Sequence, residues 1–577
     1  MCGIAGTIGS ADTAVVTAMT AALRHRGPDG DGLHADPDGH FAFGHRRLAI
    51  IDLSAGGRQP MAWAEGRFWI TYNGELYNYR DLRRDLEQAG CVFRTASDTE
   101  VVLAAYATWG DECLRRFRGM FALALADRAR GEVLLARDRL GIKPLLYTVR
   151  PEGVLFASEL RALRASGRIP DALDRQALWA YLSQGAIPQP STILAAVRML
   201  PPGALLRVGF DGRPRGEPRS WWDLAEAAAV LRPQLDGMGL EDAAAALRQR
   251  LEEATRCHLV ADVPVGAFLS GGVDSAAIVA LMRQVGGGPV RTFTVGFPAT
   301  PGAYDERRAA AATAAALGTA HHAVVIEPAD VGEAFEAVVD ALDQPSLDGA
   351  NTWFVSRAAA AHGKVALTGL GGDELFAGYP HFRRHQLADR LRRRLPVPGP
   401  LWSALRLLPE RFRHNLMLPA LNESERLATL RCRMGDRARR RALDDAFLEA
   451  LTALPATPPM PGPQEAADRR WPDVVARLSA AEVRGYLVNT LLRDGDAMSM
   501  AHGLELRPIL LDHEVVAFAL ALPSALKIRH GRGKAVFSAA LADLLPPAVL
   551  SRPKRGFELP LHAWLAGPLR ERAEAAF

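Results

Sequence analysis

The sequence predicts two domains of different fold class. Residues 1–215 are expected to form an α+β sandwich, with two antiparallel sheets between helices, and residues 216–577 an α/β domain with a parallel sheet and a helical C-terminal part. Three observations lead to this division. The chain exceeds the ~100–200 residues of one domain, short runs with period-2 alternation fill its first part, and strands alternate with helices after about residue 240.

The runs that predict strands in the first part are rich in β-branched and aromatic residues and are bounded by Gly, Pro or Asn. They are FAFGHRRLAIIDL (41–53), RFWITYNGELYN (67–78), MFALALAD (120–127), EVLLARD (132–138) and VLFAS (154–158). Helices are predicted for YRDLRRDLEQAG (79–90) and DTEVVLAAYATWG (98–110). This mixture favours sheets packed together with helices on their outer faces.

The second part reads as repeated strand–helix units, which build a parallel sheet. The predicted strands are VPVGAFL, VRTFTVGF, AHHAVVI and KVALT, at 263–269, 290–297, 320–326 and 364–368. Beyond residue 380 mainly helices are expected, with a surface loop at LPATPPMPGP (454–463). The Pro- and Gly-bearing segment 200–240 is interpreted as the linker, which places the boundary near residue 215.

Composition excludes several classes of protein. No window approaches the ~20 apolar residues of a membrane span, and no signal peptide is visible, so a cytoplasmic protein without a membrane partner is expected. The five cysteines lie apart without a CxxC pair, which argues against a disulfide framework or a zinc site. A net charge of +4 does not indicate a nucleic-acid partner. Arginine clusters such as RLRRRLP (390–396) could form such a patch, but are interpreted as solvated helix faces.

The N-terminal stretch MCGIAG places a cysteine directly after the initiator methionine, which cells usually remove when the next residue is small. Trimming would give Cys2 a free α-amine that serves as base while its thiolate attacks. Arg47 could grip an α-carboxylate, the Asn73 amide and the Gly74 N–H could form an oxyanion hole, and Asp98 could hold an α-ammonium group. Together these groups describe a pocket for a free amino acid whose side-chain carbonyl is attacked.

A resemblance extends this interpretation. A series of motifs in the first part of the chain resembles, in content and order, the glutaminase domain of class II glutamine amidotransferases. The motifs are MCGIAG, RHRGPDG, GHRRLAIID, YNGELYN, SDTEVVL, RDRLGIKPLLY and FASEL. The resemblance implies an N-terminal-nucleophile hydrolase fold and release of ammonia from glutamine through a thioester on Cys2. It also implies a set of residues that bind glutamine: Arg47, Asn73, Gly74, Glu75 and Asp98.

The SGGVDS loop (270–275) lies between a predicted strand and a predicted helix. The Gly271 and Gly272 N–H groups, the Ser270 and Ser275 hydroxyls and the helix start could form an anion cradle. The loop lacks the lysine of a Walker motif and resembles the pyrophosphate loop of the ATP pyrophosphatases.

Acids and lysines complete this second site. Asp274 would lie beside the phosphates, and two anions so close together require a Mg²⁺ ion between them. Asp373 of LGGDELFAGY could complete the metal site. Formation of an adenylate also needs positive charge at the α-phosphate. Lys554 of SRPKRGF and Lys534 of GRGK, two of only five lysines, could supply it.

A second series of motifs follows the glutaminase motifs and resembles, in content and order, the glutamine-hydrolysing asparagine synthetases. The motifs are FLSGGVDS, TFTVGF, YDERRAA, LGTAHH, GGDELFAGY, RDGDAMSMAHGLELR and SRPKRGF. This resemblance implies ATP and Mg²⁺ as cofactors, Lys554 as the catalytic lysine, and an internal tunnel that carries ammonia to an acyl-adenylate. It implies a homodimer as well. The nucleotide would be contacted by Leu269, Ser270, Gly271, Gly272, Asp274, Ser275, Val295, Thr368 and Gly369.

The expected reaction converts ATP, aspartate, glutamine and water to AMP, diphosphate, asparagine and glutamate. Two departures from the family pattern concern the acceptor: Leu370 stands where the family carries an acid, and RPILLD (507–512) has a displaced proline. An alternative is therefore an amidotransferase for another carboxylate, on a secondary metabolite or a cell-envelope precursor. An ammonia-free ligase like the β-lactam or lasso-peptide cyclases ranks lower, since such proteins typically have a degraded glutaminase pocket.

Overall fold

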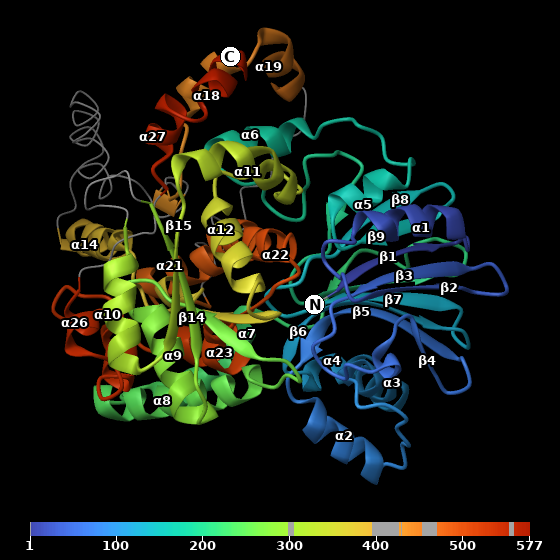
Figure 1. The fold of residues 1–577 in the computed structure, drawn as a ribbon, viewed down its shortest axis with the longest axis horizontal. Coiled ribbons are helices and arrows are strands. Elements are labelled where there is room, and N and C mark those ends of the chain that lie inside the picture. Colours follow the sequence, from blue (N-terminus) through green and yellow to red (C-terminus); the bar gives the residue numbers. More distant parts are fainter. Residues whose placement is uncertain are drawn as a thin grey trace.

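The computed structural model describes residues 2–297, 305–394, 426–427, 430–452, 470–552 and 559–576. Two bodies lie side by side (Figure 1). One carries the antiparallel strands of the first part of the chain, and the other a parallel sheet surrounded by helices. This arrangement confirms the predicted fold classes.

The N-terminal body is a sandwich of two six-stranded antiparallel sheets. The first has the order β10 (Arg198–Met199), β8 (Leu146–Arg150), β9 (Gly153–Ala157), β1 (Gly3–Ile8), β3 (Phe41–Arg47), β2 (Gly30–Ala35). The second has the order β12 (Arg219–Ser220), β11 (Ala204–Gly209), β7 (Glu132–Arg137), β6 (Gly119–Asp127), β5 (Phe68–Leu76), β4 (Met61–Trp63). Side chains from both sheets share one buried cluster, which includes Ile4, Phe43, Ala124 and Leu135.

Helices cover both outer faces of the sandwich (Figure 1). One face carries α1 (Thr13–Ala22) and α5 (Leu160–Ala165), and the other α2 (Tyr79–Gln88), α3 (Asp98–Trp109) and α4 (Cys113–Arg116). Short 3-10 turns lie at Ala55–Gly57 and Gly110–Glu112, and α6 (Arg175–Gln184) follows later in the chain. The Ser97 side chain caps α3 by accepting from the Thr99 N–H, so Asp98 lies at the start of that helix.

The second body contains a five-stranded parallel sheet. Its order is β15 (Ala320–Val325), β14 (Arg291–Gly296), β13 (Val265–Phe268), β16 (Val365–Thr368), β17 (Glu505–Pro508). The chain moves outward from β13 to β15 and then crosses back to β16, so the strand order reverses between β13 and β16. In open parallel sheets, ligands bind at this switch point, outside the carboxyl ends of the strands.

Helices enclose this sheet and form the C-terminal part of the chain. Those before β16 are α7 (Leu224–Leu235), α8 (Leu240–His258), α9 (Val273–Gly286), α10 (Arg307–Leu317), α11 (Pro328–Ala341) and α12 (Ala350–Ala360). Those after it are α13 (Gly372–Leu375), α14 (Pro380–Arg394), α18 (Asp436–Ala442), α19 (Asp445–Thr452), α21 (Val474–Glu482), a π-helix (Val483–Leu492), α22 (Arg493–Met500), a 3-10 turn (Ile509–Leu511), α23 (His513–Ala521), α24 (Ser524–Lys527), α25 (Ala535–Ala540), α26 (Pro547–Ser551), α27 (Leu561–Ala566) and α28 (Arg570–Ala576). None of the helices in the described part of the chain could cross a membrane.

The structure corrects three details of the predicted organisation. Segment 200–240 is not an irregular linker, because it contains β11, β12 and α7, and β11 pairs along β7 inside the sandwich. Strand β3 ends at Arg47, so residues 48–53 are not part of it. Strand β17 was not expected, since its buried residues include Glu505 and Arg507, whose charges break the apolar pattern. The predicted loop at 454–463 lies outside the described residues.

Candidate active sites

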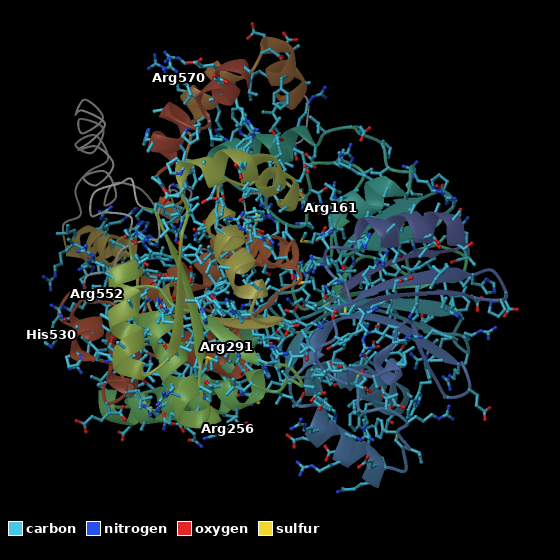
Figure 2. All side chains as sticks on the ribbon, in the orientation of Figure 1. Arg161, Arg256, Arg291, His530, Arg552 and Arg570 are labelled. Atoms are coloured by element: carbon cyan, nitrogen blue, oxygen red, sulfur yellow. The ribbon has the colours of Figure 1, made fainter. Side chains whose placement is uncertain are left out.

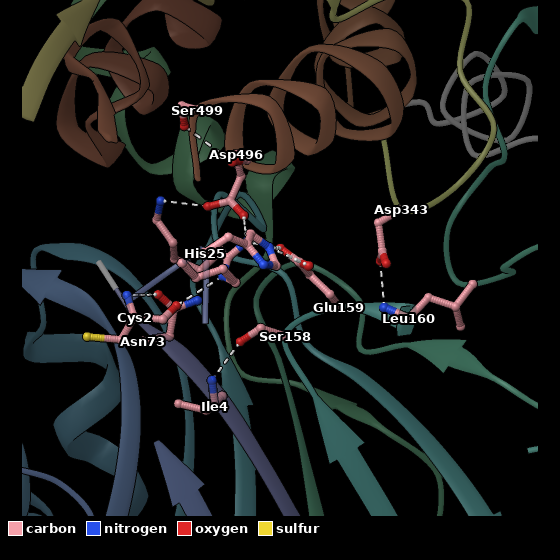
Figure 3. Close-up of polar contacts among 12 residues, drawn as sticks. Cys2, Ile4, His25, Asn73, Ser158, Glu159, Leu160, Asp343, Asp496 and Ser499 are labelled. Atoms are coloured by element: carbon pink, nitrogen blue, oxygen red, sulfur yellow. Dashed lines mark hydrogen bonds and ion pairs between the residues drawn. The ribbon is translucent and has the colours of Figure 1, made fainter. Parts of the chain in front are cut away.

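The first candidate site surrounds Cys2, which is buried at the start of β1. The backbone N–H of Cys2 donates to Asn73 Oδ1 of β5 at 3.1 Å (Figure 3). Because the Asn73 carbonyl oxygen is used in this way, the amide Nδ2 is free to act as a donor, and it has no partner among the described residues. A buried, uncommitted N–H donor on a side chain that contacts the Cys2 backbone is one component that an oxyanion hole requires.

A small cavity of about 30 Å³ adjoins this cysteine. Cys2, Arg47, Gly74, Glu75 and Asp98 all contribute to its lining, so the structure brings together the residues that the sequence predicted. Burial raises the pKa of the Cys2 thiol and also raises the pKa of Asp98, to about 6. The pocket is therefore small, and its thiol depends on a nearby base for ionisation.

Two side chains of this pocket are already engaged. The Arg47 guanidinium donates to the carbonyl oxygens of Ser54, at 2.7 Å, and of Asp52, so it is held against the loop that follows β3. Asp98 accepts the Leu76 N–H at 3.0 Å. These contacts fix the positions of the two groups predicted to hold the carboxylate and the ammonium of an amino acid.

Arg26 is a buried residue near Cys2 that sequence reasoning did not select. Its Nε donates to the Cys2 carbonyl oxygen at 3.1 Å, and its Nη1 contacts Glu159 at 2.7 Å and Asp496 of α22 at 2.8 Å. Asp496 also pairs with Lys143 at 3.1 Å. A buried cluster of charges thus joins the cysteine to a helix of the second body.

The second candidate site is the loop between β13 and α9. Ser270 Oγ and Ser275 Oγ lie 2.9 Å apart, and the Gly272 N–H donates to Ser270 Oγ at 3.1 Å. The Gly271 N–H donates to Glu306 at 3.2 Å, while Arg552 donates to the Gly271 carbonyl oxygen at 2.7 Å. The loop is compact and leads directly into a helix N-terminus, as in sites that hold phosphate groups.

Lys534 joins the two acids that the sequence predicted to hold a metal. Its Nζ lies 2.6 Å from Asp274 and 2.5 Å from Asp373. A place between two carboxylates suits a cation, and Mg²⁺ is commonly bound by one or two carboxylates together with substrate phosphates. The described residues contain no group of three or more metal-ligating side chains, so any metal here would depend on such phosphates. Lys554 lies outside the described residues.

A cavity of about 1280 Å³ opens beside this loop. Gly271, Gly272, Asp274 and Lys534 line it, together with Arg552, which Figure 2 labels on the same side of the molecule as His530 of the cavity wall. Six other residues predicted to contact the nucleotide lie in the same loop or at the carboxyl edge of the sheet and are not part of this lining: Leu269, Ser270, Ser275, Val295, Thr368 and Gly369.

Gly369 has a visible structural requirement. A Cβ at this position would lie 2.9 Å from the Asp274 carbonyl carbon, so only glycine allows the end of β16 to approach the start of α9 this closely.

A sandwich that carries a candidate cysteine nucleophile, joined to a parallel-sheet domain with a phosphate-type loop, defines a two-domain amidotransferase. Comparison with known families agrees: the glutamine amidotransferase domain model matches residues 1–222, and the asparagine synthase model matches residues 246–577. The chain belongs to the asparagine synthase family. The predicted class, an ATP-dependent, glutamine-hydrolysing, amide-forming ligase, is confirmed by this membership.

Individual relatives are similar over almost their whole length. Asparagine synthetase (glutamine-hydrolysing) 1 of Bacillus subtilis is 33% identical, with 99% of this chain and 89% of the relative covered. A protein of Mycobacterium tuberculosis with a provisional asparagine synthetase name is 36% identical, with 99% and 88% covered. An amidase of Penicillium rubens is 30% identical, with 95% and 85% covered.

Proposed function

We propose that this protein is a glutamine-dependent asparagine synthetase, which transfers ammonia from glutamine to the side-chain carboxylate of aspartate at the expense of ATP. The observation that carries the proposal is the pairing of two sites in one chain. One combines a buried thiol with an uncommitted amide donor, and the other combines a phosphate-type loop with two acids around a cation position.

In the proposed glutaminase step, removal of Met1 frees the α-amine of Cys2, which takes the thiol proton. The thiolate attacks the glutamine amide carbon, and Asn73 Nδ2 and the Gly74 N–H stabilise the oxyanion. The α-ammonium of Cys2 returns its proton to the leaving nitrogen, so collapse of this intermediate expels ammonia and leaves a thioester, which water hydrolyses to glutamate. Arg47, Glu75 and Asp98 hold the amino-acid end of glutamine, with Asp98 acting as the ionised partner of its ammonium group.

In the proposed synthetase step, the acceptor carboxylate attacks the α-phosphorus of ATP and displaces pyrophosphate. The loop 270–275 binds the phosphates through its N–H and hydroxyl groups, and Asp274 and Asp373 would hold Mg²⁺, which neutralises charge on the leaving pyrophosphate. Lys534 moves from these acids toward the phosphates, and Lys554 supplies positive charge at the α-phosphate. Ammonia then attacks the acyl-adenylate, and AMP leaves.

A second candidate, an amidotransferase for a different carboxylate, is favoured by one specific feature. Leu370 follows Gly369 in the loop after β16, half-buried, close enough to α22 that a Cβ at Gly495 would lie 3.7 Å from its Cδ1. A leucine cannot take a proton from the attacking ammonia. It leaves an apolar surface there, which suits a larger or less charged acceptor than aspartate.

The test is a screen of carboxylic acids that measures pyrophosphate and AMP in the presence of ATP, Mg²⁺ and glutamine. Aspartate is expected to stimulate pyrophosphate release and to yield asparagine. The Leu370→Glu variant serves as a matched comparison, because a carboxylate at this position is expected to increase the aspartate rate. If aspartate gives no stimulation while another acid does, the second candidate replaces the first.

A further inference from the structure

Segment 507–512, RPILLD, occupies the boundary between the two bodies. Sequence reasoning assigned it to the acceptor side alone. In the structure it begins in β17, continues through the 3-10 turn Ile509–Leu511 and ends at Asp512, the N-cap of α23. Both of its terminal side chains contact the glutaminase body, while Leu511 contacts the loop after β16, which carries Asp373.

Arg507 is the first of these contacts. Its side chain is fully buried, and Nη2 lies 3.4 Å from Oε2 of Glu75, a residue that lines the glutamine pocket. Nη1 donates to the carbonyl oxygens of His258, at 2.8 Å, and Val260, at 2.7 Å, and Nε pairs with Glu505. Arg507 therefore lies at ion-pair distance from Glu75, without a hydrogen bond between the two atoms, and its guanidinium is fixed by the second body.

Asp512 is the second contact with the glutaminase body. Its carboxylate accepts a bidentate pair from Arg118, with N–O distances of 2.7 and 3.1 Å. Bidentate guanidinium–carboxylate pairs are geometrically specific, and the Asp512 side chain is almost fully buried. Arg118 directly precedes β6, and β6 pairs with the part of β5 that contains Asn73 and Glu75.

Between these two contacts, Leu511 packs on the nucleotide side. A Cβ at Gly371 would lie 2.4 Å from Leu511 Cδ2, so the leucine rests directly on the Gly371 backbone. Gly371 has a φ of +98° and precedes Asp373 by two residues. A displacement of the loop that carries Asp373 therefore meets Leu511, since packed interiors transmit movement rather than absorb it.

We propose that segment 507–512 couples the two sites, with Arg507 and Arg118 as positioning residues that carry a displacement of the loop after β16, which holds Asp373, to Glu75 and Asn73. This inference rests on the proposed function, because it requires both pockets to bind their ligands. Coupling between sites is reciprocal, so Mg·ATP and glutamine each change the affinity for the other by the same factor.

The experiment measures binding in a Cys2→Ala background, in which glutamine binds without being hydrolysed. Calorimetry gives the glutamine Kd with and without Mg·ATP, and the ATP Kd with and without glutamine. We expect each ligand to tighten the other about fivefold or more. Arg118→Gln reduces this factor toward one while leaving the separate affinities near their starting values, and Arg507→Lys does the same where it folds.

Lys364→Gln is the matched control. Lys364 pairs with Asp29 across the same boundary at 2.7 Å, but the pair lies outside segment 507–512 and is partly exposed. This variant is expected to keep the full coupling factor. A factor of one in the Cys2→Ala parent, or an unchanged factor in Arg118→Gln, would overturn the inference. Loss of all glutamine binding and hydrolysis in the unmodified protein would instead contradict the proposed function.

Discussion

The two candidate pockets differ in size and in how each holds its charges. The cavity beside Cys2 measures about 30 Å³ and lies among buried side chains, whereas the one beside the phosphate-type loop measures about 1280 Å³. Beside the small pocket, Asn73 Nδ2 has no hydrogen-bond partner among the described residues. In the large pocket, the acids are already compensated by Lys534.

This difference shows two ways to prepare a site for chemistry. Buried surroundings with a low effective dielectric strengthen every interaction with a reacting group, so a single N–H donor there has a large effect on rate. A wide, charge-compensated pocket instead exchanges one set of ion pairs for another when a polyanion enters. Substitutions in the small pocket are therefore expected to affect rate most, and those in the large pocket binding and stability.

The largest expected effect comes from Cys2→Ala, which removes the nucleophile and keeps a small residue after the initiator. Glutamine-dependent amide formation is expected to fall by about 10⁴-fold or more, because covalent attack is lost. With ammonium salts as nitrogen source, pyrophosphate release is expected to persist. Cys432→Ala, which alters an exposed cysteine, is the control and is expected to retain glutamine-dependent activity. Equal loss with both nitrogen sources would show that the pockets are not separable.

Lys534→Met tests the charge compensation of the large pocket. In the metal-free protein Asp274 and Asp373 would then face each other without the ammonium group, and breaking a buried ion pair costs about 3 kcal/mol. The thermal midpoint of the metal-free variant is expected to fall, and added Mg²⁺ to recover much of the loss, as measured by calorimetry with and without the metal. If the variant is as stable as the parent in the absence of Mg²⁺, that result contradicts the role of Lys534 in compensating the charges of the two acids.

The same contrast explains what could be predicted from the sequence. The SGGVDS loop was predictable, because a short motif between a buried strand and a helix defines its own geometry. The chemistry of Cys2, Arg47, Gly74 and Asp98 predicted an amino-acid pocket, and the resemblance added Glu75. The arrangement of these residues in space could not be predicted, since they lie on separate elements that the fold brings together. No local sequence pattern predicts that residues from separate elements will meet in one pocket.

The residues that were missed are charged residues in buried places. Arg26 in RHRGPDG looks like a surface residue, yet its side chain is fully buried between Glu159 and Asp496. Arg507 and Glu505 concealed β17 for the same reason, because their charges cancel in pairs that only the tertiary structure reveals. Alternation of apolar residues predicts strands, but it cannot identify a strand whose buried side chains are ions.

The smallest expected effect is a pH dependence confined to the small pocket. Burial raises the pKa of Asp98 to about 6. Above this value the carboxylate is charged and can hold the ammonium group of glutamine, and below it the neutral acid cannot. The kcat/KM for glutamine, which reports the free enzyme, is therefore expected to fall about tenfold per pH unit below about 6.

Asp98→Asn is expected to raise the KM for glutamine and to abolish this acidic limb. Nucleotide binding measured without glutamine is not expected to follow the limb, since Asp98 does not line the large pocket. An acidic limb that persists in Asp98→Asn would assign the titration to another group and weaken the contrast between the two sites.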